Sequence, residues 1–463
     1  YFERREAKIV DRLTISVSDY SVMITGLPVT VTEDELQAHL LKVTQCQVAE
    51  VSLAHNCAKL VQLFMRRGRI VKQLEVVEDT ISLYKSQVCQ KSVAKLQRAR
   101  DKLLAKLRSF HHLQHHASTG DEVIAAFVTF EDEAGPLKCL EKYPNGLVHR
   151  MFQHNWLRLR GHVLQMAPAP NPSTIMWENL GTPYPERLCR RLFTNFVSLL
   201  LVFGSFCLLL WASYRQAQAE EAGGALTCPE FTVTLADAEA NPDILYCYCD
   251  ALPSAEATTS PVCKEWLRDK ALAFLLFVLS SASVVIVNAM LNIIMKKLVM
   301  FEHHPSMDFR EKSLARRLFM VQFVNTALVV LLANAHITDT PLVSGQRYRD
   351  FESGWYLTVG GSILLTMCLN VVTPHVAPTL RTLRLLCRRR CQTPVSQRQL
   401  NELYTGLEFH LSIRYAQVTN VVFVCMMYSA GLPLLIPIAL VMVTIAYWMD
   451  KILLLRMYKT PPL

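Results

Sequence analysis

The chain of 463 residues is 51% hydrophobic and only 19% charged, which fits a protein with half of its residues in lipid and half in water. It contains no nucleophile triad, glycine-rich phosphate loop or metal-ligand spacing, so the sequence predicts no enzyme, no cofactor and no metal site. The net charge of +9 is unevenly placed along the chain and therefore bears on topology. Because the first residue is Tyr1 rather than Met, we expect a fragment of a longer protein.

Residues 1–190 predict a small α+β domain followed by a linker. The expected elements are a strand at 19–28, a helix at 32–43, strands at 48–53 and 122–130, a helix at 132–143 and a strand near 156–166. The first helix has Thr32 as its N-cap and Glu35 three residues later, which predicts a capping box. The order β-α-β-β-α-β is that of the ferredoxin-like sandwich found in RNA-recognition-motif (RRM) domains.

An insertion at about 57–118 separates the second and third strands. From Arg69 to Ser118 it has no Gly or Pro, and apolar residues recur at helical spacing. Since both neighbouring strands belong to one sheet, the insertion must double back, which predicts an antiparallel pair of helices. The basic face of this pair either contacts anionic lipid headgroups or is simply solvated.

The sheet is not predicted to bind RNA. Sheets that bind RNA stack bases on aromatic rings at set positions of strands one and three. Phe127 supplies one such ring, but Met23 and Ala125 occupy the other two positions. We therefore expect no nucleic-acid partner and interpret the domain as a structural lever attached to the membrane part.

Six apolar stretches dominate residues 191–463. Each is long enough to cross a hydrocarbon core of about 30 Å at a rise of about 1.5 Å per residue. They lie at about 191–214, 268–297, 313–335, 354–379, 413–431 and 432–455. The series predicts an α-helical polytopic membrane protein with six transmembrane helices in this fragment.

The charges between these stretches predict their orientation. The loop at 215–266 carries nine Asp or Glu against two Lys or Arg, whereas the loops at 296–317 and 380–414 are basic. Positively charged loops stay cytosolic, so residues 1–190 and both basic loops are assigned to the cytosol, and 215–266 to the outside.

The acidic outer loop also holds four cysteines, Cys228, Cys247, Cys249 and Cys263. An even number in a compartment where disulfides persist predicts two bridges, and a loosely ordered loop with free thiols is the alternative. Of the three pairings, the one that joins Cys247 to Cys249 is disfavoured by its small ring.

The segment APAPNPSTIMWENL at 167–180 joins the sheet domain to the first apolar stretch. Together with the strand sequence AAFVTF, it resembles the hyperosmolality-gated (OSCA) and calcium-permeable stress-gated cation channels, whose motif is close to A-P-E-P-x-D-x-x-W-x-N-L. The matching positions are Ala167, Pro168, Pro170, Trp177, Asn179 and Leu180. Ala169 departs from the family's Glu, and the linker is about two residues longer.

This resemblance implies an anoctamin-like channel architecture with an RRM-like cytosolic domain. Family members have eleven spans, so the chain is expected to lack the first three and the last two, and to keep the five that line the family's ion path. Anoctamins carry acidic calcium ligands on later spans. These are not matched here, so a buried calcium-activation site is not expected.

Polar side chains inside the apolar stretches are the candidate functional residues, because such groups are costly in lipid and face a cavity or a neighbouring helix. Pairs three or four residues apart share one helix face. The pore-lining candidates chosen on this basis are Asn288, Asn292, Gln322, Asn325, Thr366 and Asn370. Their oxygens can replace part of a cation's hydration shell, and hydrogen bonds between helices are the alternative role.

The stretch 354–379 has helix breakers near both ends. The candidates for gating hinges are Gly360, Gly361, Pro374 and Pro378. A broken helix beside a conduction path bends under small tension. Tight helix packing is the alternative role for the glycines.

The leading hypothesis is a mechanically or osmotically gated, calcium-permeable, non-selective cation channel in the plasma membrane. A lipid scramblase of anoctamin-like architecture is the alternative, and a non-conducting scaffold is a third class. Membrane lipids and cations including calcium are the expected partners, and both a monomer and a homodimer stay open.

Overall fold

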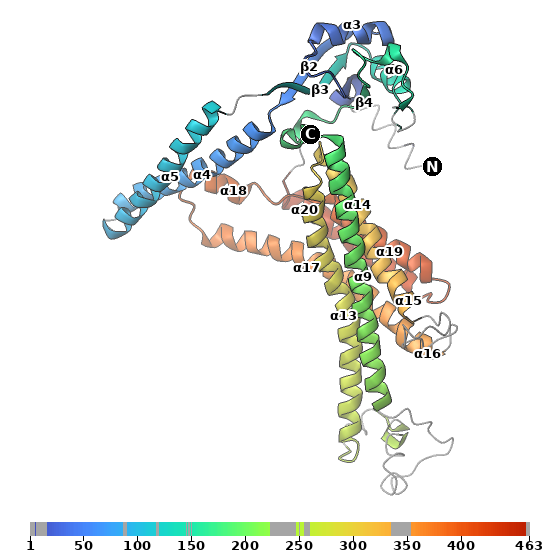
Figure 1. Cartoon of the computed structure of the whole chain (residues 1–463). Coiled ribbons are helices and arrows are strands. Elements are labelled where there is room, and N and C mark those ends of the chain that lie inside the picture. The colour runs from blue at the N-terminus through green and yellow to red at the C-terminus, as the bar shows by residue number, and fades with distance from the viewer. Residues whose placement is uncertain are drawn as a thin grey trace.

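The structure, a computed structural model, describes residues 5, 16–86, 90–116, 120–144, 146, 149, 151–222, 247–249, 251–253, 260–334 and 353–459. It has three parts: a sheet domain, a pair of helices that projects to one side, and a bundle of longer helices (Figure 1). The sheet domain lies over one end of the bundle, and the helices α9 (Tyr184–Ala222) and α13 (Lys264–Phe301) reach furthest from it.

Four antiparallel strands form the sheet in the order β2-β3-β1-β4, which confirms the predicted ferredoxin-like arrangement. The strands are β1 (Ser21–Thr25), β2 (Val48–Asn56), β3 (Gly120–Phe130) and β4 (Gln165–Pro168). Alternate strand residues point to one face, where they pack with α3 (Glu33–Thr44) and α6 (Ala134–Lys142). Ile24, Leu36 and Val128 are fully buried in this core.

Two details of the domain differ from the sequence prediction. Thr32 is the N-cap of α3, but its side chain makes no capping hydrogen bond. Glu35 instead accepts two hydrogen bonds from the Arg160 guanidinium at 2.7 and 2.6 Å, a charge-assisted pairing that engages both carboxylate oxygens. β4 also starts later than the strand expected near 156–166, because Arg160 and Gly161 form a turn with positive φ.

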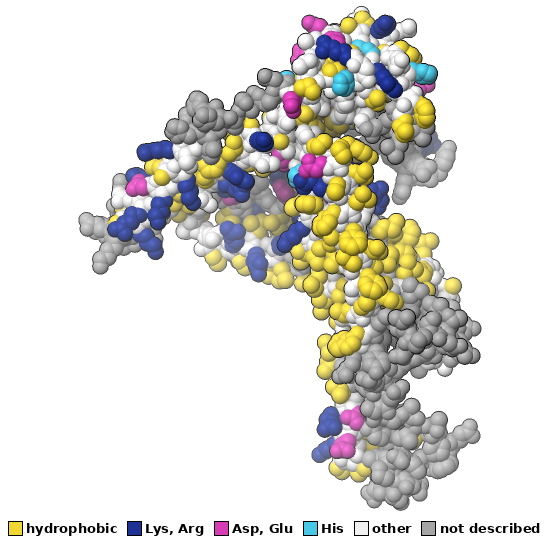
Figure 2. Space-filling view, in the orientation of Figure 1, with side chains coloured by type: hydrophobic (Ala, Val, Ile, Leu, Met, Phe, Trp, Pro, Cys, Tyr) yellow, Lys and Arg dark blue, Asp and Glu magenta, His cyan; other side chains and the backbone are white. Residues whose placement is uncertain are grey.

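The insertion forms the predicted pair of long helices, α4 (Ala58–Ser86) and α5 (Gln90–His116), which pack side by side along their length. Figure 2 shows basic side chains along this pair. Two ion pairs join α4 to α18 (Gln397–Tyr404): Lys72 with Glu402, and Glu75 with Arg398 at 3.1 Å. Both pairs are exposed and contribute little to the stability of the fold. They show which face of α4 contacts α18, the segment that follows the helix α17 (Gly361–Cys391).

The linker covers the outer face of the sheet. Its short helix α8 (Trp177–Leu180) places Leu180 in an apolar cluster with Met23 and Ala125. The Trp177 ring meets the edge of Phe127 at a centroid distance of 6.1 Å. The face on which RNA-binding sheets stack bases is therefore covered by the chain's own linker.

The same linker contacts the turn between α13 and α14 (Met307–Phe323). The Met176 amide donates a 2.9 Å hydrogen bond to the Pro305 carbonyl, and Asn179 Nδ2 donates one of 3.1 Å to the His304 carbonyl. α8 is thus a single short element held between the sheet and the turn of two bundle helices.

The remaining helices complete the bundle. They are η3 (Val324–Leu328), α15 (Val329–Asn334), α16 (Ser353–Trp355), η4 (Tyr356–Gly360), α19 (Leu411–Tyr428) and α20 (Leu435–Arg456). η3 and η4 are single π-helical turns that continue into α15 and α17. Such turns are rare and often occur at functional sites.

Among the described residues, five helices are long and apolar enough to cross a membrane. They are Tyr184–Leu208, Ser281–Phe301, Met307–Leu331, Gly361–Cys391 and Leu435–Arg456. The remaining predicted span, 413–431, forms α19, an 18-residue helix that is not among the five because its polar residues lower its hydropathy. α19 packs against α14 and α20 inside the bundle.

On the face shown in Figure 2, large apolar side chains gather over the middle of the bundle. Leu199 on α9 and Ile293 on α13, for example, are 66% and 62% exposed. A contiguous apolar surface of this extent indicates contact with lipid rather than with water.

Candidate functional site

A small polar cavity of about 80 Å³ lies where α13, α14, α17, α19 and α20 meet. Amide side chains from four helices dominate its lining. The lining residues are Val285, Asn288, Ala289, Asn292, Gln322, Asn370, Thr373, Pro374, Gln417, Asn420, Val421 and Met442. We call it the amide cavity; it has room for a few water molecules.

Hydrogen bonds between α13 and the helix formed by α14 and η3 build one wall of the cavity. Asn292 Oδ1 accepts from Gln322 Nε2 at 2.8 Å. One turn away, Asn288 Oδ1 accepts from Asn325 Nδ2, and Asn288 Nδ2 donates to Thr326 Oγ1, both at 2.9 Å. Asn288, Asn292 and Gln322 therefore hold two helices together in addition to lining the cavity.

The structure separates the six pore-lining candidates into two groups. Asn288, Asn292, Gln322 and Asn370 line the amide cavity. Asn325 and Thr366 are 0% and 4% exposed and do not line it. Asn325 lies in the π-helical turn η3, where its amide is directed to Asn288.

Two further amides on α19 belong to the cavity. Gln417 Oε1 and Asn420 Oδ1 are buried and have no hydrogen-bond partner among the described residues. A buried acceptor without a partner costs about 1–3 kcal/mol, so oxygens that face a cavity favour water or a cation there. No group of three His, Cys, Asp or Glu in the described part of the chain is arranged to hold a metal ion. The cavity thus offers neutral oxygens rather than carboxylates.

Sequence reasoning did not select Gln417. It is three residues before Asn420, the same spacing that selected Gln322 and Asn325, so the one-face rule applied to α19 would have found the pair.

The proline-containing part of α17 lies beside the cavity. Pro374 and Pro378 are both inside the helix. Because proline has no N–H, the carbonyls four residues earlier, those of Asn370 and Pro374, lose their helical partners. Arg414 of α19 supplies a substitute: its Nη1 donates to the Pro374 carbonyl at 3.1 Å. Arg414 is 9% exposed, and its Nη2 lies 3.0 Å from Asp450 Oδ1 on α20.

The glycine pair lies at the other end of the same helix. Gly360 ends the π-helical turn η4, and Gly361 begins α17. A Cβ atom on Gly360 would lie 3.3 Å from Leu432 Cδ2 and 3.5 Å from the Trp355 ring. The absence of a side chain at Gly360 therefore lets Leu432 and the Trp355 ring pack closely against the start of α17, as expected for a glycine at a helix-packing contact.

A buried charge cluster joins three helices at the end of the bundle nearest the sheet. Glu302, the C-cap of α13, is 1% exposed, forms an ion pair with Arg317 of α14 and accepts a hydrogen bond from Thr194 of α9. Burial raises the pKa of the Glu302 carboxyl. The contact of His304 Nε2 with the carboxyl at 3.0 Å, the hydrogen bond from Thr194 and the charge of Arg317 outweigh burial and hold this pKa below its usual value. The cluster therefore stays charged at neutral pH.

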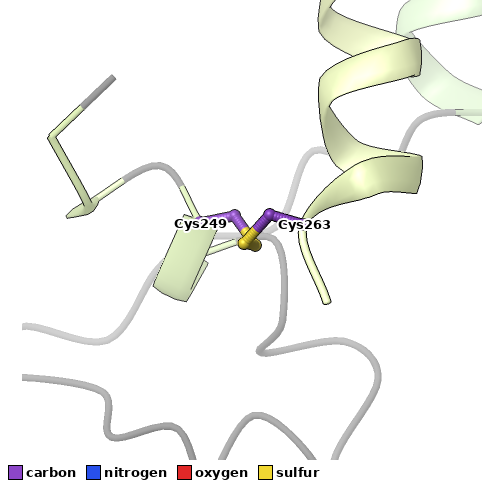
Figure 3. Close-up of a disulfide and its surroundings, with 2 residues drawn as sticks. All are labelled: Cys249 and Cys263. Atoms are coloured by element: carbon purple, nitrogen blue, oxygen red, sulfur yellow. A yellow bond between two sulfur atoms is a disulfide. The ribbon is translucent and has the colours of Figure 1, made fainter. Parts of the chain in front are cut away.

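At the far end of the bundle, Cys249 and Cys263 form a disulfide (Figure 3). Cys263 is the N-cap of α13, so the bridge ties the preceding segment to the start of that helix. Cys247 is disulfide-bonded as well. Cys228 lies outside the described residues.

Apolar helices with a lipid-facing surface, an internal cavity of amides and an α+β domain docked on one end define a polytopic membrane protein of the channel or transporter class. Residues 19–179 match a family model described as "Cytosolic domain of 10TM putative phosphate transporter". Residues 365–462 match one described as "Calcium-dependent channel, 7TM region, putative phosphate". The chain belongs to the OSCA-like family of calcium-dependent channels, which contains both domains and is not a family of enzymes. No curated protein matches the chain.

Proposed function

We propose that the chain contains the ion path of a mechanically or osmotically gated, calcium-permeable, non-selective cation channel. The observation that carries this proposal is the amide cavity, which lies beside the part of α17 where Pro374 is located. Amide oxygens can replace part of a cation's hydration shell. Without a carboxylate cluster such a lining holds no cation tightly, which suits passage of several cations rather than storage of one.

The gating part of the proposal rests on α17. Its two prolines remove two internal hydrogen bonds, so this part of the helix bends at lower cost than an unbroken helix. Arg414 holds the broken part to α19 and α20. Tension that moves α17 relative to those helices would change the width of the amide cavity.

The coupling part rests on α8, which contacts both the sheet and the turn between α13 and α14. In the proposed topology the sheet domain and the basic loops are cytosolic, and 215–266 faces the outside of the plasma membrane. A displacement of the sheet or of the helical pair would then reach two helices of the amide cavity through a single short linker.

Patch recording from liposomes that contain the purified protein tests this function. We expect suction to open a current carried by Na⁺, K⁺ and Ca²⁺. A fluorescent-lipid assay on the same liposomes tests the scramblase alternative, which requires a polar groove open to lipid. Absence of current up to the tension that ruptures the membrane, or rapid lipid exchange between leaflets, would contradict the channel proposal.

A further inference from the structure

A second hollow, separate from the amide cavity, lies between α14 and α19. It has a volume of about 410 Å³, within the usual range for sites that bind small molecules. We call it the α14–α19 groove. Ala315 and Ala416 lie in its lining, and the small size of these two residues leaves room between the larger Phe319 and Tyr415. Its accessible surface is almost wholly apolar.

Two cations stand at one end of the groove. Lys312 and Arg316 are exposed, four residues apart on one face of α14, and both line the groove. Neither has an ion-pair partner in the part of the chain that the structure describes. Glu311 also lines this end of the groove. Its carboxylate accepts a hydrogen bond from Ser412 and lies 3.5 Å from Arg310, so the charges of Lys312 and Arg316 leave this end of the groove positive.

The charges and the apolar walls lie at different depths. α14 begins at Met307, beside the turn that contacts the cytosolic domain, so Lys312 is in its second turn on the cytosolic side. Phe319 lies seven residues further on, about 10 Å deeper along the helix. The groove is therefore basic where lipid headgroups lie and apolar where acyl chains lie.

This arrangement matches an amphiphile with an anionic head. A soluble anion would use only the two cations, and an uncharged apolar molecule would leave them without a partner. We propose that the α14–α19 groove binds an anionic phospholipid of the cytosolic leaflet. Its phosphate contacts Lys312 and Arg316, and one acyl chain lies along Phe319 and Thr419. This site is distinct from the proposed ion path, and its occupancy is measured without recording current.

The test uses the full chain in lipid nanodiscs that contain a trace of phosphatidylserine with a photoreactive group on one acyl chain. After illumination, peptide mass spectrometry locates the labelled residues. We expect labelling at Phe319 and Thr419, at least fivefold above that by a phosphatidylcholine probe of the same chain length. The double variant Lys312→Gln/Arg316→Gln should lose at least fivefold of the phosphatidylserine labelling.

Two further variants keep the proposal falsifiable. Ala315→Leu retains both charges and fills the groove, so it should reduce labelling by a similar factor. Arg381→Gln/Arg384→Gln removes the same charge from exposed positions of α17 and should leave groove labelling unchanged. Thermal unfolding confirms that each variant is folded. Equal labelling by the two probes, full labelling of Ala315→Leu, or equal loss in the α17 control would each overturn the proposal.

Discussion

Arg414 donates a hydrogen bond of 3.1 Å to the carbonyl oxygen of Pro374, the acceptor that Pro378 leaves without a helical partner. A side chain of α19 thus completes the backbone hydrogen bonding of α17. Because the same guanidinium pairs with Asp450, three helices meet at one buried cation. The two prolines therefore remove hydrogen bonds within α17. One of the carbonyls that they leave free bonds to Arg414, which connects α17 to α19 and α20.

Arg414→Gln should destabilise the protein strongly, because it leaves Asp450 as a largely buried carboxylate without its partner. Breaking a buried pair of this kind costs about 3 kcal/mol, which thermal unfolding in detergent will measure. Arg398→Gln, which breaks the exposed pair with Glu75, is the matched control and should cost under about 1 kcal/mol. Arg414→Gln/Asp450→Asn should recover part of the loss; no recovery would mean that Arg414 acts mainly through the Pro374 carbonyl.

Gln417→Met should separate conduction from stability. The variant removes a buried acceptor that has no partner among the described residues and keeps the side-chain volume, so the melting temperature should stay constant or rise. The amide cavity becomes less polar, so unitary conductance should fall. Thr366→Val, outside the cavity lining, should leave conductance unchanged. Unchanged conductance in Gln417→Met would place the ion path elsewhere.

Asn179→Ala should shift gating without altering conductance. The variant removes the hydrogen bond to the His304 carbonyl, through which α8 holds the turn between α13 and α14. The pressure for half-maximal activation should therefore rise, while single-channel current stays constant. Trp156→Ala, an exposed residue of the sheet domain, is the control. A change in unitary current would contradict a role restricted to coupling.

The folded protein should become less stable as the pH falls, because the fold holds His410 in its neutral form. Burial lowers the pKa of His410, and the charge of Lys296 lowers it further; Arg310 acts in the same direction, and Glu311 and Glu408 oppose. Lys296 Nζ lies 2.8 Å from His410 Nε2, which requires a neutral ring as acceptor. The folded protein therefore binds fewer protons than the unfolded chain, so stability is lost as pH falls below the unfolded value of about 6.5. His410→Gln should reduce the slope of melting temperature between pH 7.5 and 5.5; an identical slope would exclude His410 as the cause.

Thiol labelling tests topology. A membrane-impermeant maleimide applied to intact cells should label Cys249 and Cys263 only after reduction of their disulfide. Cys387 and Cys391 are exposed free thiols in the basic last turns of α17 and should react only after permeabilisation. Their reaction in intact cells would reverse the proposed orientation.

Local patterns predicted the elements of this fold better than the contacts between them. Alternation and turn residues predict the strands along the chain, and the order β-α-β-β-α-β predicts the ferredoxin-like sheet that they form. The absence of Gly and Pro together with helical spacing predicts α4 and α5. The capping box at Thr32 failed because the partner of Glu35 is 125 residues away in sequence. Helix spacing placed Asn288 and Asn292 on one face, but it carries no information on whether a face meets a cavity, a second helix or both.

The role of Arg414 was also beyond the reach of the sequence. In a sequence, an arginine at the start of an apolar stretch indicates only which side of the membrane that end of the helix faces. Its partner, the Pro374 carbonyl, exists as a free acceptor only because of Pro378, 36 residues earlier in the chain. Only the packing of α17 on α19 brings donor and acceptor together.

The docking of α8 on the sheet sets where the N-terminal domain ends as a folding unit. A fragment that stops after β4 would leave Met23, Ala125 and Phe127 exposed to water as an apolar patch on the open side of the sheet. Such a fragment should self-associate. Any ligand that bound to it would occupy the surface that α8 covers in the whole protein, so it would not be a native partner. The smallest autonomous piece of this domain extends through Leu180, so its boundary falls inside the segment that also contacts the membrane helices.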